Sequence, residues 1–269
     1  GLTNFGVAVQ ATSTPLWFTG TSGIYASGTS RFGTTTIKTL NGVLYADQFL
    51  GSDIGAKINN AYANCPATGC TIVVPSGAYT FSTKIAFETN AKPVRLECSA
   101  GAKMTWSGTG TSTVFNTGTD FSSRRGLFGC HLYGPDVGPG GTTVGVQIGG
   151  TNGEPGVTIE GNYIIGFGKG IVTTKNVWDI NVKNNRIQFN DRNIEVYSAD
   201  NSGENFVFTG NNISDCNTVT KCVYFRTNGS VTSSWFGNVF DDAQLYFEDG
   251  NANINITGGG FENPNEGAI

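Results

Sequence analysis

The sequence is poor in charged side chains and in the residues that bind metals or nucleic acids. Only 13% of its 269 residues are charged, and the formal net charge is -4. An acidic balance disfavours a nucleic-acid partner, because nucleic-acid phosphates require a basic surface. The sequence has six cysteines but only one histidine, His131. Because no second histidine is present, a zinc site of the Cys/His type is poorly supported.

Long hydrophobic stretches are also missing from the sequence. No apolar run approaches the roughly 18 residues of a membrane-spanning helix, and we therefore expect no membrane span. No basic-then-apolar leader opens the chain, so we expect the start at Gly1 to reflect processing or trimming. The 39 glycines and 18 phenylalanines instead favour short strands joined by tight turns.

A short segment recurs roughly every 21 to 27 residues through the C-terminal half. Each copy has alternating apolar residues, a small residue and usually an asparagine. The copies are Ile159-Glu160-Gly161-Asn162-Tyr163-Ile164, Val182–Ile187, Phe208–Ile213, Trp235–Phe240 and Ile256–Phe261. A fixed period in this range indicates a solenoid, because one unit cannot bury its apolar face alone. Alternation with a period of two indicates strands, so the sequence predicts an all-β parallel β-helix.

The composition divides the chain into two expected regions. Residues 1–45 are rich in Gly, Ser and Thr and predict an N-terminal arm or linker, whereas residues 46–269 form the β-helix domain. A helix at about 53–64, with Ser52 or Asp53 as its N-cap, is predicted to cover the open end of the solenoid. No matching cap precedes Ile269, so either a neighbouring subunit covers that end or the native protein continues.

Three features of the sequence resemble the pectate-lyase-like superfamily, especially its secreted and phage-tailspike-related members. They are the helix Asp53–Asn64, the segment Ile72–Tyr79 and the series Asn162, Asn185, Asn211 and Asn238. This resemblance covers about residues 45–262. It implies a right-handed, single-stranded parallel β-helix with three strands per coil and stacked asparagines in the tight turn between the second and third. It also allows a homo-oligomer, such as the trimers that are common among related phage proteins.

The cysteines predict disulfide bonds. The candidate pairs are Cys65/Cys70, Cys216/Cys222 and, in neighbouring coils, Cys98/Cys130. The alternative is a ladder of free, inward-facing cysteines. Disulfides form in oxidising compartments, so we expect a protein that is secreted or displayed on a cell or virion surface.

The asparagine series sets the register of the strand that follows the next bend of each coil. The residues of this strand predicted to face outward are Glu195, Tyr197, Tyr224, Arg226, Tyr246 and Glu248. Because coils stack about 4.8 Å apart, these side chains are predicted to form one exposed patch. Aromatic rings beside charged groups suit a polysaccharide or other glycan, and enzymes resembling this fold commonly carry their saccharide groove on this sheet. The alternative is ordinary strand propensity with an Arg226–Glu248 cross-strand pair.

Two reactions fit this patch. In an inverting glycosidase, Glu195 and Glu248 would be the acid and base. In a lyase, Arg226, or Lys183 and Arg186 on an adjacent face, would be the base, with Ca²⁺ as cofactor on aspartates of the bends. The candidate catalytic residues are Glu195, Glu248, Arg226, Asp215, Asp241 and Asp242, and the candidate substrate-binding residues are Tyr197, Tyr224, Tyr246, Asp191 and Arg192. Clustered loop aspartates are, however, more often turn formers than calcium ligands.

The main hypothesis is therefore a secreted carbohydrate-active β-helix that cleaves an acidic or neutral polysaccharide as a hydrolase or a lyase. The alternative is a non-catalytic glycan-binding, adhesin or tail-fibre-like module. The Gly-His-Gly and Arg-Ile-Lys motifs of polygalacturonases are absent, which keeps the alternative open. Serine hydrolase chemistry is not predicted, because no nucleophile elbow accompanies His131.

Overall fold

The computed structural model describes residues 39–40, 42–88, 92–116, 124–136, 138–150, 154–174, 177–198, 205–217, 221–227, 231–248 and 252–262. All of them belong to one compact unit, Ile37–Ile269. Of the expected N-terminal arm, residues 1–38 and 41 lie outside the described residues, and the boundary at residue 45 stays a prediction. Among the described residues, no helix is both long and apolar enough to cross a membrane.

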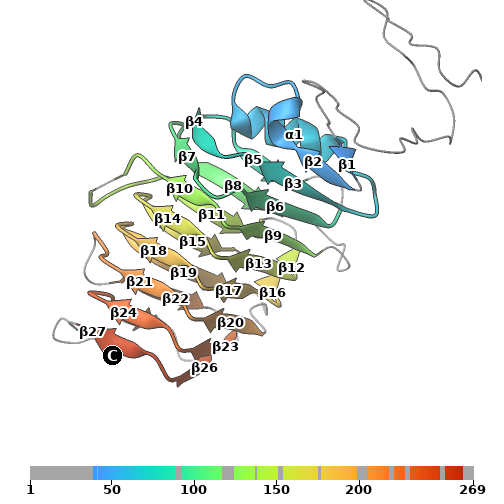
Figure 1. The fold of residues 1–269 in the computed structure, drawn as a ribbon. Coiled ribbons are helices and arrows are strands. Elements are labelled where there is room, and N and C mark those ends of the chain that lie inside the picture. The colour runs from blue at the N-terminus through green and yellow to red at the C-terminus, as the bar shows by residue number, and fades with distance from the viewer. Residues whose placement is uncertain are drawn as a thin grey trace, which may run out of the picture. The chain divides into compact units, whose positions relative to one another are not determined.

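The described chain is an all-β parallel solenoid of about seven turns, built from three stacked sheets (Figure 1). Sheet A contains β1 (Thr39–Leu40), β2 (Val43–Tyr45), β3 (Cys70–Val74), β6 (Val94–Cys98), β9 (Arg125–Phe128), β13 (Val157–Glu160), β17 (Asn181–Lys183), β20 (Phe206–Thr209), β23 (Val231–Phe236) and β26 (Ala252–Thr257). Sheet B contains β4 (Gly77–Phe81), β7 (Ala102–Trp106), β10 (His131–Tyr133), β14 (Tyr163–Ile165), β18 (Arg186–Gln188), β21 (Asn212–Ser214), β24 (Val239–Asp241) and β27 (Gly260–Glu262). Sheet C contains β5 (Ile85–Phe87), β8 (Thr111–Phe115), β11 (Val144–Ile148), β15 (Lys169–Thr173), β19 (Arg192–Ser198), β22 (Val223–Thr227) and β25 (Leu245–Phe247). A short pair, β12 (Glu154–Pro155) and β16 (Val177–Trp178), lies outside these sheets.

The predicted fold class, with three strands per coil, is confirmed. Strands of successive coils pair in parallel, so equivalent residues stack in columns. One inward-facing column of sheet A consists of Ile72, Leu96, Leu127, Ile159, Val182, Phe208 and Trp235. Each of these side chains is at most 1% exposed, and their removal from water is the main driving force for coil stacking.

The predicted asparagine ladder occupies the tight turn between sheets A and B. The Nδ2 atom of Asn162 donates to Oδ1 of Asn185 at 3.0 Å, Asn185 donates likewise to Asn211 at 3.0 Å, and Asn211 donates to Asn238 at 2.8 Å. Each acceptor oxygen also receives the backbone N–H of the preceding rung, for example Asn185 N to Asn211 Oδ1 at 3.0 Å. The four amides therefore satisfy backbone groups that the turn would otherwise bury unpaired.

The cysteines form three disulfides, as expected: Cys65–Cys70, Cys98–Cys130 and Cys216–Cys222. The alternative of free thiols is wrong, since all six cysteines are paired. Cys98–Cys130 joins two coils at the corner that the asparagine ladder occupies farther along, and the backbone N–H of Cys130 donates to Asn162 Oδ1 at 2.8 Å. This disulfide thus extends the ladder toward the N-terminal coils.

The capping helix is also confirmed. Helix α1 (Ile54–Ala63) follows the 3-10 turn η1 (Ala46–Gln48) and packs on β3, β4 and β5 at the N-terminal end of the coils (Figure 1). Gly55 allows this close approach, because a Cβ atom there would lie 2.1 Å from the carbonyl oxygen of Thr83.

Asp53 connects the helix to the first coil. Its Oδ1 accepts from the backbone N–H of Ala56, and its Oδ2 accepts from those of Ser82 and Thr83, each at 2.9 Å. Burial alone raises the pKa of the Asp53 carboxyl, but these backbone hydrogen bonds outweigh it and lower the pKa below its ordinary value of 3.8.

We predict that Asn211→Ala destabilises the solenoid by about 2 to 4 kcal/mol, because two buried donors of Asn185 lose their acceptor. Denaturant unfolding followed by circular dichroism measures the change. The control is Asn212→Ala, an exposed neighbour whose loss should cost less than about 0.5 kcal/mol. Equal destabilisation by the two variants would refute the role of the ladder.

We predict that Asp53→Asn lowers stability at pH 7 by about 1 kcal/mol, because the amide retains only one acceptor oxygen. The carboxylate's contribution is present above pH 3.8 and is lost as the pH falls through the lowered pKa of the folded protein. The difference in melting temperature between wild type and variant should therefore shrink below pH 3.8. Asp47→Asn, at an exposed carboxylate nearby, is the control and should show no such convergence.

Candidate functional site

The predicted outward residues do lie on one sheet. We call Glu195, Tyr197, Tyr224, Arg226, Tyr246 and Glu248 the sheet C patch. Glu195 pairs with Tyr224 and Tyr224 with Tyr246 in adjacent strands, while Tyr197 pairs with Arg226, and Glu248 directly follows β25. The side chain of Arg226 lies outside the described part of the structure. The same register predicts that the alternate residues of these strands face inward, and they are buried except Phe247 of the last described sheet C strand, which is 39% exposed. The buried ones are Ile171, Thr173, Ile194, Val196, Val223, Phe225 and Leu245.

Glu195 is not exposed as predicted, because two basic side chains cover it. It is 5% exposed, and the Nζ atom of Lys169 lies 3.0 Å from both of its carboxylate oxygens. Arg192 Nη1 lies 2.5 Å from Oε2. Since both oxygens are engaged by cations, Glu195 in this position is better suited to anchoring the two basic groups than to donating a proton.

Tyr224 is the second residue of the patch that is covered rather than exposed. It is 4% exposed, with the guanidinium carbon of Arg192 4.6 Å and the Nζ atom of Lys221 4.7 Å from its ring centroid. Its hydroxyl donates to Oε2 of Glu248, an exposed residue at the end of the strand. Tyr224 therefore holds the Glu248 carboxylate in place.

Tyr246 presents an accessible ring beside this cluster. It is 37% exposed, its centroid lies 5.7 Å from that of Tyr224, and the two rings are inclined by 48°. Lys221 Nζ lies 4.3 Å from its centroid, so this ammonium is close to both tyrosines. The arrangement offers a hydrophobic ring and a positive charge to the same ligand.

The sequence analysis missed Lys169 and Lys221, although a signal for them was present. In three consecutive coils a basic residue stands two positions before the first inward apolar residue: Lys169 before Ile171, Arg192 before Ile194 and Lys221 before Val223. We call Lys169, Arg192 and Lys221 the basic row. Extending the strand alignment by two residues would have revealed it.

The aspartates of the bends have mainly structural positions. Asp215 and Asp242 have positive φ angles of 50° and 47°, in the left-handed region that turn-forming Asp adopts more readily than most residues. Asp241 lies in β24 of sheet B, and Asp191 is 7% exposed with Oδ2 accepting from the Gly141 N–H at 2.5 Å. In the described part of the chain, no three His, Cys, Asp or Glu side chains group as metal ligands. These residues do not fit a calcium site.

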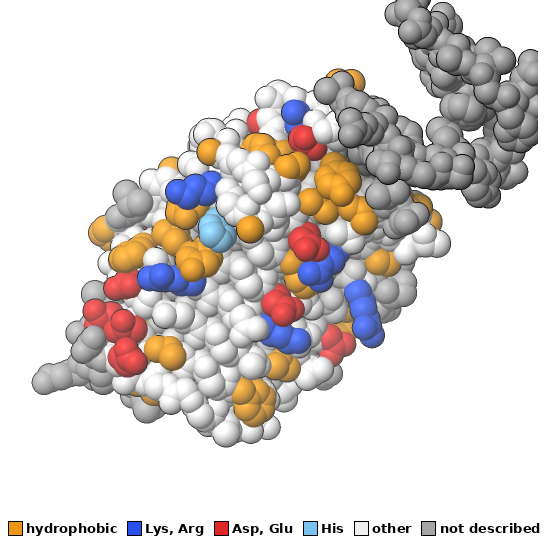
Figure 2. Space-filling view, viewed as in Figure 1, with side chains coloured by type: hydrophobic (Ala, Val, Ile, Leu, Met, Phe, Trp, Pro, Cys, Tyr) orange, Lys and Arg blue, Asp and Glu red, His pale blue; other side chains and the backbone are white. Residues whose placement is uncertain are grey.

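The remaining candidates lie on other sheets. Lys183 belongs to sheet A and Arg186 to sheet B, outside the sheet C patch. The ring of His131 packs on that of Tyr163 at 4.4 Å between centroids, and Figure 2 shows it among hydrophobic and basic side chains. Burial, and then the charge of Lys103, lower the pKa of His131.

Comparisons with known proteins find only remote similarities. No protein-family model and no curated protein matches the chain. ORF18 of Geobacillus virus E2 is 14% identical with a TM-score of 0.44, covering 80% of this chain and 59% of that chain. The Dettilon tailspike protein is 16% identical with a TM-score of 0.48, covering 78% and 48%. The A-module of the Azotobacter vinelandii mannuronan C-5 epimerase AlgE6 is 14% identical with a TM-score of 0.22, covering 82% and 100%. This chain thus spans less than two thirds of the first two proteins.

Proposed function

We propose that the sheet C patch and its basic row bind an acidic polysaccharide. The observation that carries the proposal is the position of Lys221 over Tyr224 and the exposed Tyr246. The C–H face of a sugar packs on an aromatic ring, and a uronate carboxylate pairs with the adjacent ammonium. Among the described residues Lys221 forms no ion pair, so its charge is available to a ligand.

The rest of the basic row supports a preference for acidic over neutral sugars. Lys169 and Arg192 contact the Glu195 carboxylate, and Lys221 lies against the ring of Tyr224, whose hydroxyl donates to Glu248. Glu195 forms ion pairs with Lys169 and Arg192, and these ion pairs hold both basic side chains at the starts of their strands. An oxyanion at this edge would therefore meet preorganised positive charge.

Cleavage of the same polysaccharide is the second candidate function. The observation that favours it is the hydrogen bond from the Tyr224 hydroxyl to the exposed Glu248 carboxylate, next to the accessible ring of Tyr246. In a hydrolase, Glu248 would act as a general acid or base. In a lyase, Arg226 remains the proposed base. Simple binding by an adhesin-like or tail-fibre-like module is the alternative.

We also propose that the protein works outside the cytoplasm, as a secreted protein or on a cell or virion surface. Three disulfides in one domain support this, because such bonds persist in oxidising compartments. Assembly into a homo-oligomer stays a proposal from the sequence resemblance.

For binding, we predict that Lys221→Ala weakens the affinity for oligogalacturonate about five- to tenfold, because a cation close to two rings is lost. Tyr246→Ala should weaken the binding of acidic and neutral oligosaccharides alike. Isothermal titration calorimetry measures both, and Lys183→Ala on sheet A is the charge-matched control. If neither acidic nor neutral glycans bind, or if Lys221→Ala behaves as the control does, the proposed binding face is wrong.

For cleavage, we predict that Glu248→Gln lowers the rate about 100-fold or more while glycan binding survives, because the proton-transfer group is removed and its shape is kept. Glu195→Gln should instead weaken binding, since it loosens Lys169 and Arg192. A polysaccharide panel is assayed for new reducing ends, which report hydrolysis, and for ultraviolet-absorbing unsaturated products, which report elimination. A panel without either product would leave binding as the function.

A further inference from the structure

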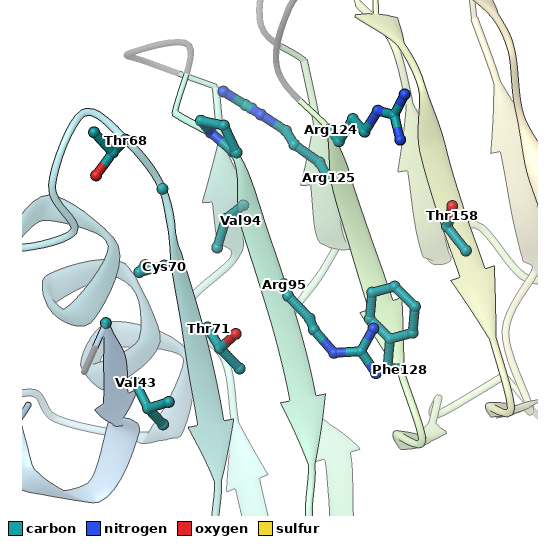
Figure 3. Close-up of a pocket in the computed structure, with 13 residues that line it drawn as sticks. Val43, Thr68, Cys70, Thr71, Val94, Arg95, Arg124, Arg125, Phe128 and Thr158 are labelled. Atoms are coloured by element: carbon teal, nitrogen blue, oxygen red, sulfur yellow. The ribbon is translucent and has the colours of Figure 1, made fainter. Parts of the chain in front are cut away.

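A cavity lies on the outer face of sheet A, on the first coils of the solenoid. Its volume is about 510 Å³, and its walls come from β2, β3, β6, β9 and β13 (Figure 3). This size is within the range of roughly 300 to 1,000 Å³ that is usual for small-molecule sites. We call it the sheet A pocket. It shares no residue with the sheet C patch or the basic row.

Beside the pocket, a glycine interrupts an outward-facing row of side chains. Thr71, Arg95, Gly126 and Thr158 are aligned in adjacent strands. At Gly126 an added Cβ would lie 2.6 Å from the ring of Phe128, because that ring lies down over the glycine. The Phe128 ring thus covers Gly126 and itself forms part of the pocket wall.

Three arginines line the sheet A pocket. Arg95, Arg124 and Arg125 are three of the seven arginines of the whole chain, and no acidic residue is among the described residues that line the pocket. Such a concentration is unexpected on a chain whose net charge is -4. Of these arginines, Arg95 and Arg124 place positive charge at the pocket surface, with Arg95 paired to Glu97, whereas Arg125 is buried.

The three arginines have different positions. The guanidinium carbon of Arg95 lies 3.5 Å from the centroid of Phe128, and its Nε donates to Glu97 Oε2 at 2.9 Å, so the group is fixed flat on the ring. Arg124 is exposed and forms no ion pair with any described residue. Arg125 is buried, and its guanidinium donates to the Phe87 carbonyl and the Tyr62 hydroxyl.

We propose that the sheet A pocket binds the oxyanion group, a carboxylate or a sulfate, of an acidic saccharide residue. A guanidinium presents paired N–H donors whose geometry matches such oxyanions. Arg95 offers its Nη atoms from a fixed position, and Arg124 offers all the N–H donors of its guanidinium. Pro93 supplies apolar surface for the C–H groups of the sugar ring. This proposal does not depend on the function of the sheet C patch.

The test is titration with a trigalacturonate, a sulfated disaccharide, a neutral maltotriose and inorganic sulfate. Binding to the pocket is followed by NMR shifts of the Gly69, Gly126 and Thr158 amides and by calorimetry. At least one acidic saccharide should bind about tenfold more tightly than inorganic sulfate, because it adds ring contacts to the charge pair. Maltotriose should not shift these amides. Equal affinity for inorganic sulfate and both acidic saccharides, or shifts with maltotriose, would overturn the assignment.

Variants separate this pocket from the sheet C patch. Arg124→Ala should lower the affinity measured at these amides about tenfold, as expected for loss of a charge-assisted pair. Lys183→Ala, which removes a charge from the same sheet outside the pocket, and Lys221→Ala, in the basic row, should leave it unchanged. Unaltered affinity in Arg124→Ala, with circular dichroism and melting temperature matching the wild type, would contradict the proposal.

Discussion

The amide ladder from Asn162 to Asn238 is the interaction on which the rest of the structure depends. A coil must turn sharply between sheets A and B, and such a turn buries backbone groups that cannot pair within their own coil. Each asparagine amide accepts from the preceding rung and donates to its neighbours, so a single side-chain type repeats the solution in four successive coils. Because the rungs stack in register, the strands that follow are forced into register as well. The Cys98–Cys130 disulfide extends the same constraint covalently toward the capped end.

Register at the ladder determines which residues meet on the outer faces. A shift of one residue would exchange inward and outward side chains along a whole strand. With the ladder in place, Glu195, Tyr224 and Tyr246 form one row of sheet C. The same stacking places Thr71, Arg95, Gly126 and Thr158 in one row of sheet A, beside the sheet A pocket. The ladder therefore does no chemistry itself, but both proposed binding surfaces follow from the alignment that it imposes.

Features that repeat with the coil were predictable from the sequence, and features that depend on side chains reaching across coils were not. The solenoid, the Asp53-capped helix, the asparagine ladder and the outward position of the sheet C patch follow from periodicity and local rules. The burial of Glu195 and Tyr224 does not, because it results from Lys169, Arg192 and Lys221 folding over them from the strand starts. The sheet A pocket was equally hidden, since it depends on the ring of Phe128 lying over Gly126. Strand alternation gives the direction of a Cβ atom, not the course of a long side chain beyond it.

The two basic regions show how the solenoid tolerates like charges in adjacent coils. Two cations about 5 Å apart repel each other by roughly 1 kcal/mol even in water, and more strongly near a protein surface. Lys169 and Arg192 are paired in adjacent strands, and Glu195 between them offsets this repulsion. Lys221 instead lies against the rings of Tyr224 and Tyr246, which attract the cation without neutralising it, whereas Arg192 and Arg95 each combine a ring contact with a carboxylate partner. Positive charge therefore remains beside Tyr246 and in the sheet A pocket. In both places the fold leaves part of the repulsion between cations uncompensated, and a bound oxyanion would relieve it.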